Sequence, residues 1–241
     1  MRSILKLYQY NEYIVAEEES SDIIIVERKG EFFRLTRCEF HELFGDYELS
    51  CVNELKDNYF LMGLFVLTIF SAVLWYFWKA SYTLVDSNIA KAFWVLVLNL
   101  PLHEAGHILC LKIFYPKSKI KMGMKFTFIY PSFFVDTSYS YLLPRSKKVM
   151  VHLAGGFVNS LFLMAILCTA PKQIPYLYLL VSNILINFIP IVKGDGYYAL
   201  ASLRNKFHFK KTAKAAFLED LVRGVIMFAV LDFLAMFYSG K

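Results

Sequence analysis

The string HEAGH, residues 103–107, holds the residues whose types and spacing could do chemistry. On an α-helix, His103 and His107 fall one turn apart on one face, with Glu104 beside them. Two imidazoles at this spacing bind zinc, and a neighbouring carboxylate serves as a general base. The string lies in an apolar stretch, where ionisable side chains are costly and mark functional sites. The pentapeptide therefore predicts a metal-dependent hydrolase that works within a bilayer.

A catalytic zinc site usually has three protein ligands, so the two histidines need a third. Asp195 is the candidate, because it directly follows an apolar segment that Pro190 should end. Gly194 and Gly196 on either side free the backbone, so the carboxylate can turn back toward the histidines. Two other interpretations stay open: Asp195 as a turn residue, and the histidines as polar contacts between helices.

The composition places the chain among membrane proteins. Of its 241 residues, 57% are hydrophobic and 17% are aromatic, well above the values of soluble domains. The net charge of +6 comes from lysines and arginines that cluster between apolar segments, which is a topology signal and argues against nucleic-acid binding. The four cysteines show no CxxC spacing, which argues against a cysteine zinc site or a disulfide framework.

Residues 1–57 are polar and acidic, and they predict a small α+β region. Short runs that favour strands are followed by a short helix: Tyr13–Ala16, Asp22–Val26 and Phe32–Leu35, then Cys38–Phe44. This region could be a regulatory or peptide-binding domain, or an appendage without binding activity. No signal-peptide pattern opens the chain, so we expect this region to stay in the cytosol.

Five apolar segments predict about five transmembrane helices, and the fold class expected is an all-α polytopic membrane protein. The segments are Asn58–Trp78, about Ile89–Phe114, Val149–Ala170, Tyr176–Val192 and about Leu221–Tyr238. Between the second and the third, residues 115–148 alternate polar and apolar side chains, which favours a β-hairpin or a re-entrant element. The expected divisions are the cytosolic region 1–57 and a membrane-embedded domain, 58–241.

Charge predicts the orientation of these segments. Residues 115–148 and 193–223 each carry seven Lys or Arg, whereas the opposite connections offer Lys79 and Lys172. The positive-inside rule then places the N-terminus in the cytosol of a multi-pass protein, which we expect in a bacterial cell membrane. His107 would lie roughly 10 to 15 Å from the cytosolic end of its helix at about 1.5 Å per residue. Asp195 also follows a cytosolic helix end, so the two ligand sources can meet.

The motifs together resemble the site-2 protease family of intramembrane zinc metalloproteases. The resemblance rests on HEAGH in an apolar helix, on AGGFVN at residues 154–159, and on Asn187, Pro190, Asp195 and Gly196 in an NxxPxxxxDG arrangement. It covers residues 88–200. The family's AGP reads AGG here and its LDG reads KGDG, and neither departure removes a ligand. KGDGY, together with FVDTSYSYL at residues 134–142, looks more like the bacterial peptide zinc metalloproteases.

The resemblance implies roles for particular residues. His103, His107 and Asp195 would ligate Zn2+, and Glu104 would activate a water molecule. Asn159 and Asn187 would line the site, although both equally fit interhelical hydrogen bonds. The segment Phe126–Asp136 would guide an extended substrate, which would be a membrane peptide or a single-pass protein in the lipid bilayer.

Two other functions remain at this stage. One is a non-proteolytic membrane protein of the same fold that binds a peptide as an immunity, receptor or chaperone component. The other is a transporter, which would predict paired broken helices or internal repeats. The sequence shows no convincing repeat. It carries no signal for the oligomeric state.

Overall fold

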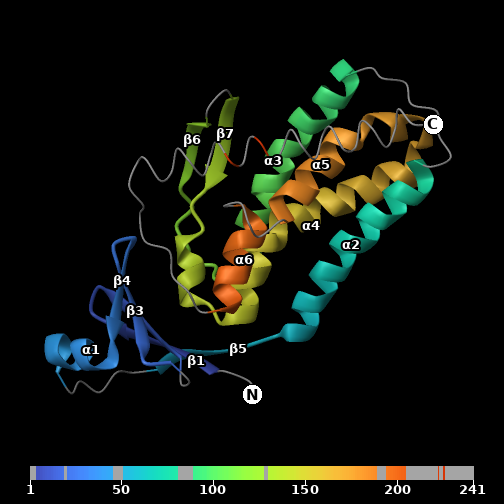
Figure 1. The fold of residues 1–241 in the computed structure, drawn as a ribbon. Coiled ribbons are helices and arrows are strands. Elements are labelled where there is room, and N and C mark those ends of the chain that lie inside the picture. Colours follow the sequence, from blue (N-terminus) through green and yellow to red (C-terminus); the bar gives the residue numbers. More distant parts are fainter. Residues whose placement is uncertain are drawn as a thin grey trace.

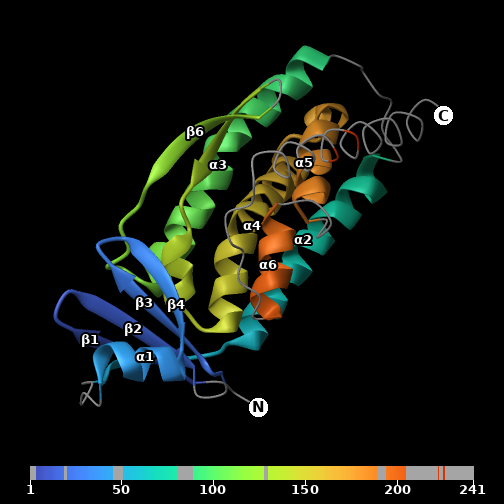
Figure 2. The same ribbon diagram turned by 60° about the vertical axis from the view of Figure 1, so that its left-hand side comes forward.

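The computed structural model describes residues 4–18, 21–45, 51–80, 89–127, 130–188 and 194–204, together with Val222 and Val225. In this part of the chain, an N-terminal antiparallel sheet lies at one end of a group of long helices (Figure 1). A separate β-hairpin runs along one of the helices (Figure 2).

The sheet has five strands in the order β4-β3-β2-β1-β5. The strands are β1 (Ile4–Tyr10), β2 (Tyr13–Glu18), β3 (Ile23–Arg28), β4 (Glu31–Thr36) and β5 (Cys51–Lys56). Lys29 and Gly30 both have positive φ, 51° and 88°, and form the two-residue turn that joins β3 to β4. Helix α1 (Arg37–Phe44) follows, and its first turn is closed by a capping box between Thr36 and Glu39.

Each face of this sheet covers a different partner, because successive side chains in a strand point to opposite sides. Val15, Ile24 and Val26 pack with Phe40 of α1 on one face. Leu7 and Ile25 belong to the other face, which packs on the end of α3 and the start of α4. The sheet is thus continuous with the core of the helical part.

Five α-helices make up the described helical part. They are α2 (Tyr59–Ala80), α3 (Ile89–Phe114), α4 (Arg145–Thr169), α5 (Tyr178–Phe188) and α6 (Asp195–Leu203), and two short 3-10 helices, η1 (Ser138–Leu142) and η2 (Pro171–Tyr176), precede α4 and α5. Helix α4 packs against α2, α3 and α6 (Figures 1 and 2). It is therefore the central helix.

Three described helices are long and apolar enough to cross a membrane: α2, α3 from Ala90 onward, and α4. Their outward faces carry large apolar side chains that a soluble protein would bury, such as Phe60, Leu74, Trp94 and Ile113. Lipid can cover these side chains without cost.

The expectation of an all-α protein with about five spans is wrong. The N-terminal part folds as a five-stranded sheet, and the described residues contain three helices of spanning length. The apolar segment Tyr176–Val192 yields only the 11-residue helix α5, preceded by η2, while residues 189–193 lie outside the described part. The predicted last span, Leu221–Tyr238, lies almost wholly outside it as well. The apolar character of residues 176–192 did not indicate that their α-helix begins only at Tyr178.

The alternating region after α3 contains the antiparallel hairpin that its pattern favoured. Strands β6 (Met122–Thr127) and β7 (Tyr130–Val135) pair from Met122 opposite Val135 to Thr127 opposite Tyr130. Strand β7 contacts α3, and Figure 2 shows the hairpin lying along that helix. The end of β7 is thereby fixed beside the helix that carries HEAGH.

Buried polar contacts fix the sheet to the helices. Arg145, the first residue of α4, pairs with Glu18 at 2.8 Å, and the hydroxyl of Tyr139 donates to Glu27 at 3.3 Å. Burial, together with the nearby Glu27 carboxylate, raises the pKa of Tyr139 to about 12, so this phenol stays a donor at neutral pH. Both carboxylates are buried, so losing either partner would leave a buried charge with fewer compensating contacts.

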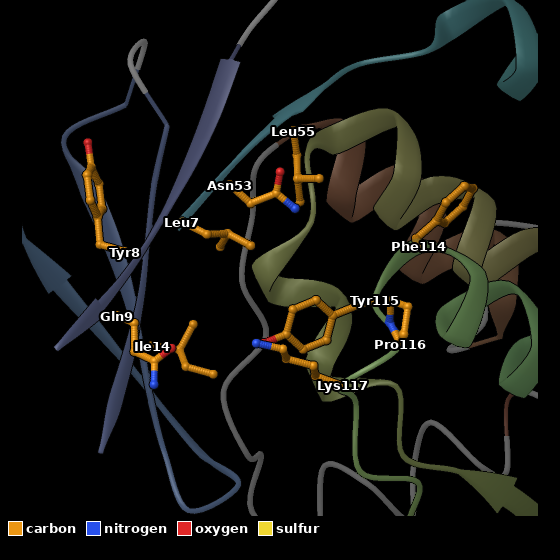
Figure 3. A pocket seen from close by; sticks show the side chains of 10 residues that line it. All are labelled: Leu7, Tyr8, Gln9, Ile14, Asn53, Leu55, Phe114, Tyr115, Pro116 and Lys117. Carbon is orange, nitrogen blue, oxygen red and sulfur yellow. The ribbon is translucent and has the colours of Figure 1, made fainter. Parts of the chain in front are cut away.

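The same junction leaves a hollow of 220 Å³ between β1, β5 and the end of α3 (Figure 3). A second hollow of 260 Å³ shares part of its lining with the first. The shared residues are Ile14, Tyr115 and Lys117. Apolar side chains and a lysine therefore face the same space.

A close approach of α3 and α4 leads to a first prediction. A Cβ at Gly106 would lie 2.7 Å from the carbonyl oxygen of Ala154, whereas a Cβ at Gly63 of α2 would meet nothing within 4 Å. Gly106→Ala should destabilise the fold by about 1–3 kcal/mol through overpacking. Gly63→Ala should be neutral, or stabilise by up to ~1 kcal/mol through helix propensity. Thermal unfolding in detergent measures both, and equal melting temperatures for the two variants would contradict the packing argument.

Candidate metal centre

Helix α3 presents His103 and His107 toward the interior, one turn apart. Both side chains are buried, and their Nε2 atoms lie 3.3 Å from each other. The spacing of four residues places them on one face, as the sequence predicted.

Asp195, the first residue of α6, completes the cluster. Its Oδ2 lies 3.1 Å from Nε2 of His103, and its Oδ1 lies 3.5 Å from Nε2 of His107. One possible ligand atom from each of the three residues lies within 4.8 Å of the other two. The structure thus brings Asp195 next to two histidines that lie 88 and 92 positions before it in the chain.

Close backbone contacts on both sides of Asp195 hold it beside the two histidines. A Cβ at Gly196 would lie 2.2 Å from the carbonyl oxygen of Phe188, the last residue of α5. A Cβ at Gly194 would lie 3.3 Å from the carbonyl oxygen of Asn187. The chain therefore crosses the end of α5 in contact with its backbone, which a larger side chain at Gly196 would prevent.

The three side chains fit a divalent metal ion. Burial would raise the pKa of Asp195, but the adjacent imidazoles lower it below its usual range, so the carboxylate is ionised. Its Oδ2 is buried, lies 3.1 Å from Nε2 of His103 and has no hydrogen-bond partner among the described residues. Two imidazole nitrogens and one carboxylate oxygen that converge on a single point form a typical donor set for catalytic zinc. An ion at that point would satisfy the unpartnered oxygen.

The second nitrogen of His107 sets which nitrogen can bind a metal. Its Nδ1 lies 2.8 Å from the carbonyl oxygen of Val151, which can only accept, so Nδ1 carries the proton. When the ring is neutral, its lone pair is therefore on Nε2, toward Asp195 and His103. Carbonyl groups commonly orient metal-binding histidines in this way.

His103 makes the corresponding contact with an amide. Its Nδ1 lies 3.0 Å from Nδ2 of Asn159. When Nε2 of His103 binds a metal, Nδ1 must carry the proton, so Asn159 must present its oxygen instead. A half-turn of the amide does this by exchanging its two end atoms. The NH2 group of Asn159 then occupies the buried position that Oδ1, which has no hydrogen-bond partner, holds now.

Asn187 is linked to the cluster through a residue that was not predicted. Asn159 and Asn187 both donate to Oδ1 of Asn183, at 3.4 Å and 3.2 Å. Asn183 lies one turn before Asn187 on α5, so helical spacing could have indicated it. Asn159 thus makes an interhelical hydrogen bond as well as contacting His103, whereas the hydrogen bond from Asn187 to Asn183 lies within α5.

Glu104 lies beside the cluster and next to the end of the hairpin. It interacts electrostatically with His103, His107 and Asp195, and with the backbone N–H of Val135 in β7. The hairpin therefore helps to orient the carboxylate that the sequence predicts as a base. The side chains of residues 125–133 in the predicted substrate guide lie outside the description.

Two further polar residues lie close by that sequence reasoning did not place in the site. His152 of α4 is buried, stacks on Tyr198 with ring centroids 5.7 Å apart, and interacts electrostatically with His107 and Asp195. Asn99 is fully buried one turn before His103. His152 has no sequence signal, because its neighbours come from other helices.

Comparison with known proteins identifies one curated relative in Bacillus subtilis (strain 168), named "Putative peptide zinc metalloprotease protein YydH". The two are 36% identical over 111 residues, which cover 43% of this chain and 44% of the relative. The chain thus spans less than half the length of the relative. No protein-family model matches the chain, and no solved structure matches it. The similarity agrees in general terms with a metallopeptidase.

The histidines have room only because residue 155 lacks a side chain, which gives a second prediction. A Cβ at Gly155 would lie 2.5 Å from Nε2 of His103 and 2.6 Å from Nε2 of His107. A Cβ at Gly156 would come no closer than 3.7 Å to Cδ1 of Ile69. Gly155→Ala should weaken zinc binding about tenfold or more by displacing the imidazoles, whereas Gly156→Ala should keep it.

Chelator competition on the purified protein measures the zinc affinity of both variants. Melting temperatures recorded without added metal separate loss of the site from loss of the fold. Wild-type affinity in Gly155→Ala would contradict the placement of the two imidazoles.

Proposed function

We propose that this protein is a membrane-embedded zinc metalloprotease of the site-2 protease type. It hydrolyses a peptide bond of a membrane-spanning or membrane-associated peptide near the cytosolic leaflet. The observation that carries the proposal is the convergence of His103, His107 and Asp195 on one buried point, with Glu104 alongside. The name of the Bacillus subtilis relative, a peptide zinc metalloprotease, supports the same reaction class.

The proposed location of the site follows from charge. Lys112, at the end of α3, and Arg145, at the start of α4, lie at the end of the helices where the sheet packs. Lysines 117, 119 and 121 follow α3 directly. Basic residues favour the cytosolic side, so the sheet and the N-terminus are proposed to lie in the cytosol of a multi-pass protein.

The roles of the chain's residues follow from their contacts. His103, His107 and Asp195 would hold the zinc ion. Zinc supplies Lewis-acid chemistry when bound, since it polarises a scissile carbonyl and makes water more acidic. Val151 keeps the proton of His107 on Nδ1, and Asn159 does the same for His103 once its amide has turned. These contacts keep both Nε2 lone pairs available.

Glu104 is the proposed general base and acid. Its carboxylate takes a proton from the attacking water and then delivers it to the nitrogen of the leaving amine. The N–H of Val135 restrains the carboxylate next to the histidines. A substrate helix must unwind before reaction, because its carbonyls are engaged within the helix. An extended substrate could add to the β6–β7 hairpin by β-augmentation.

Residues 1–57 are proposed to act as a regulatory or peptide-binding domain on the protease. Their sheet packs on the helices that carry the site, and the hollow in Figure 3 is formed jointly by β1, β5 and the end of α3. A change in the sheet can therefore reach the end of α3 through direct contacts.

The third prediction tests catalysis. Glu104→Gln removes the base but none of the metal-binding atoms, so it should keep bound zinc and lose about 10²-fold or more of the proteolysis. Glu42→Gln makes the same chemical change on the exposed face of α1 and should leave both unchanged. Comparative peptidomics of cells that carry each variant shows which membrane peptides accumulate uncut.

Full substrate processing by Glu104→Gln would eliminate the protease proposal. Full biological function in both Glu104→Gln and His103→Ala would instead favour a non-proteolytic peptide-binding protein. Zinc content, measured on the purified variants, shows independently whether His103 is a ligand.

A further inference from the structure

Asn99 is a buried amide without a hydrogen-bond partner among the residues that the structure describes. Its side chain is 0% exposed, and neither Nδ2 nor Oδ1 makes a hydrogen bond. Burying an amide without hydrogen-bond partners is unfavourable, because the group loses the hydrogen bonds that water would make. A polar group that stays unsatisfied in an apolar interior calls for an explanation, and an absent ligand is one.

The position of Asn99 relates it to the metal centre. It precedes His103 by four residues and His107 by eight, so all three lie on one stripe of α3. This stripe faces the interior, where His103 contacts Asn159 of α4 and where α3 packs on α5 (Figure 2). At about 1.5 Å per residue, Asn99 lies roughly 6 Å along the helix from His103, on the side away from the sheet.

A second unpartnered amide atom belongs to Asn159 of α4, whose side chain contacts His103. Oδ1 of Asn159 is buried and makes no hydrogen bond, although Nδ2 of the same side chain contacts both His103 and Asn183. With His103 bound to a metal, the amide turns and offers an N–H donor at that position. Asn99 and Asn159 would then provide donors and an acceptor that no described protein group uses.

We propose that Asn99 and Asn159 form a subsite for a backbone peptide group of the substrate. A peptide group presents one N–H donor and one carbonyl acceptor, which two side-chain amides can satisfy together. The subsite binds substrate residues on the side of the scissile bond that lies farther from the sheet. An extended chain advances about 3.3 Å per residue, so the bound group is about two residues from the scissile bond. This inference rests on the proposed protease function.

The subsite explains why these positions are asparagines in an apolar helix interior. A peptide that unwinds within a membrane exposes its own amide groups, which water would otherwise satisfy. Fixed amides beside the metal replace those lost hydrogen bonds. They recognise the backbone and not a side chain, so they favour extended chains over helical ones.

The test uses Asn99→Leu, which keeps the size of the side chain and removes its polarity. The probes are acetohydroxamate, which reaches only the zinc ion, and two leucine dipeptide hydroxamates that extend to opposite sides of the chelating group. Binding to the purified, zinc-loaded protein is measured by calorimetry. Gln173→Leu, which removes a side-chain amide at an exposed position of η2, is the control.

We expect Asn99→Leu to weaken one dipeptide hydroxamate tenfold or more and to leave acetohydroxamate within twofold of wild type. Its melting temperature should not fall, because an unsatisfied amide is replaced by an apolar group of similar size. Gln173→Leu should match wild type with every probe.

Wild-type affinity of Asn99→Leu for both dipeptide hydroxamates would overturn the subsite, while binding of acetohydroxamate would leave the zinc site intact. A lower melting temperature together with weaker binding of all probes would also overturn it, since Asn99 would then be structural. If no hydroxamate binds the wild-type protein, the proposed function itself fails.

Discussion

The close approach of α3 and α4 is the constraint on which the rest of this structure depends. Gly106 and Gly155 make it possible, one on each helix: a Cβ at either position would fall within 3 Å of the opposite helix or its imidazoles. Because these positions lack side chains, two histidines can lie in the space between the helices. The carbonyl of Val151 and the amide of Asn159, both on α4, then reach the outer nitrogens of the two rings. The close packing of α3 on α4 therefore also orients the two histidines.

The remaining elements position the carboxylates beside the histidines or fix the two helices in place. Helix α6 begins with Asp195 and lies so close to the end of α5 that a Cβ at Gly196 would meet the backbone of Phe188. Strand β7 ends beside Glu104. The N-terminal sheet is tied to the start of α4 through Glu18 and Arg145. The contacts of the hairpin and of the sheet end on α3 and α4, so a disturbance in either has a direct route to the metal centre.

The interior around the centre is more polar than an apolar helical core requires. Asn159, Asn183 and Asn187 are joined by hydrogen bonds, and Asn99 lies one turn from His103 with no partner at all. Such groups are costly in a bilayer unless they are satisfied. A metal ion and an extended peptide are two ligands that would satisfy them, the first at Nε2 and Oδ2, the second at the side-chain amides. The need to satisfy buried polar groups thus connects the metal-binding residues with the kind of substrate proposed.

The sequence by itself determined the residues that meet and the helix that presents them. HEAGH gave the histidine pair because four residues make one helical turn, and α3 covers Ile89–Phe114 as its apolar run predicted. Asp195 could be named because proline and glycines mark the end of a segment. Strands β1 and β5 and the size of the N-terminal sheet were not foreseen, since their pairing joins residues about 50 positions apart. The number of spans was wrong because an apolar run shows where a chain avoids water, and not whether it forms one long helix. Only the tertiary structure decided that Gly155 makes room for the imidazoles, that Asn183 links the two predicted asparagines, and that Asn99 and His152 lie beside the centre. These contacts join different helices, and their spacing along the chain carries no periodic signal.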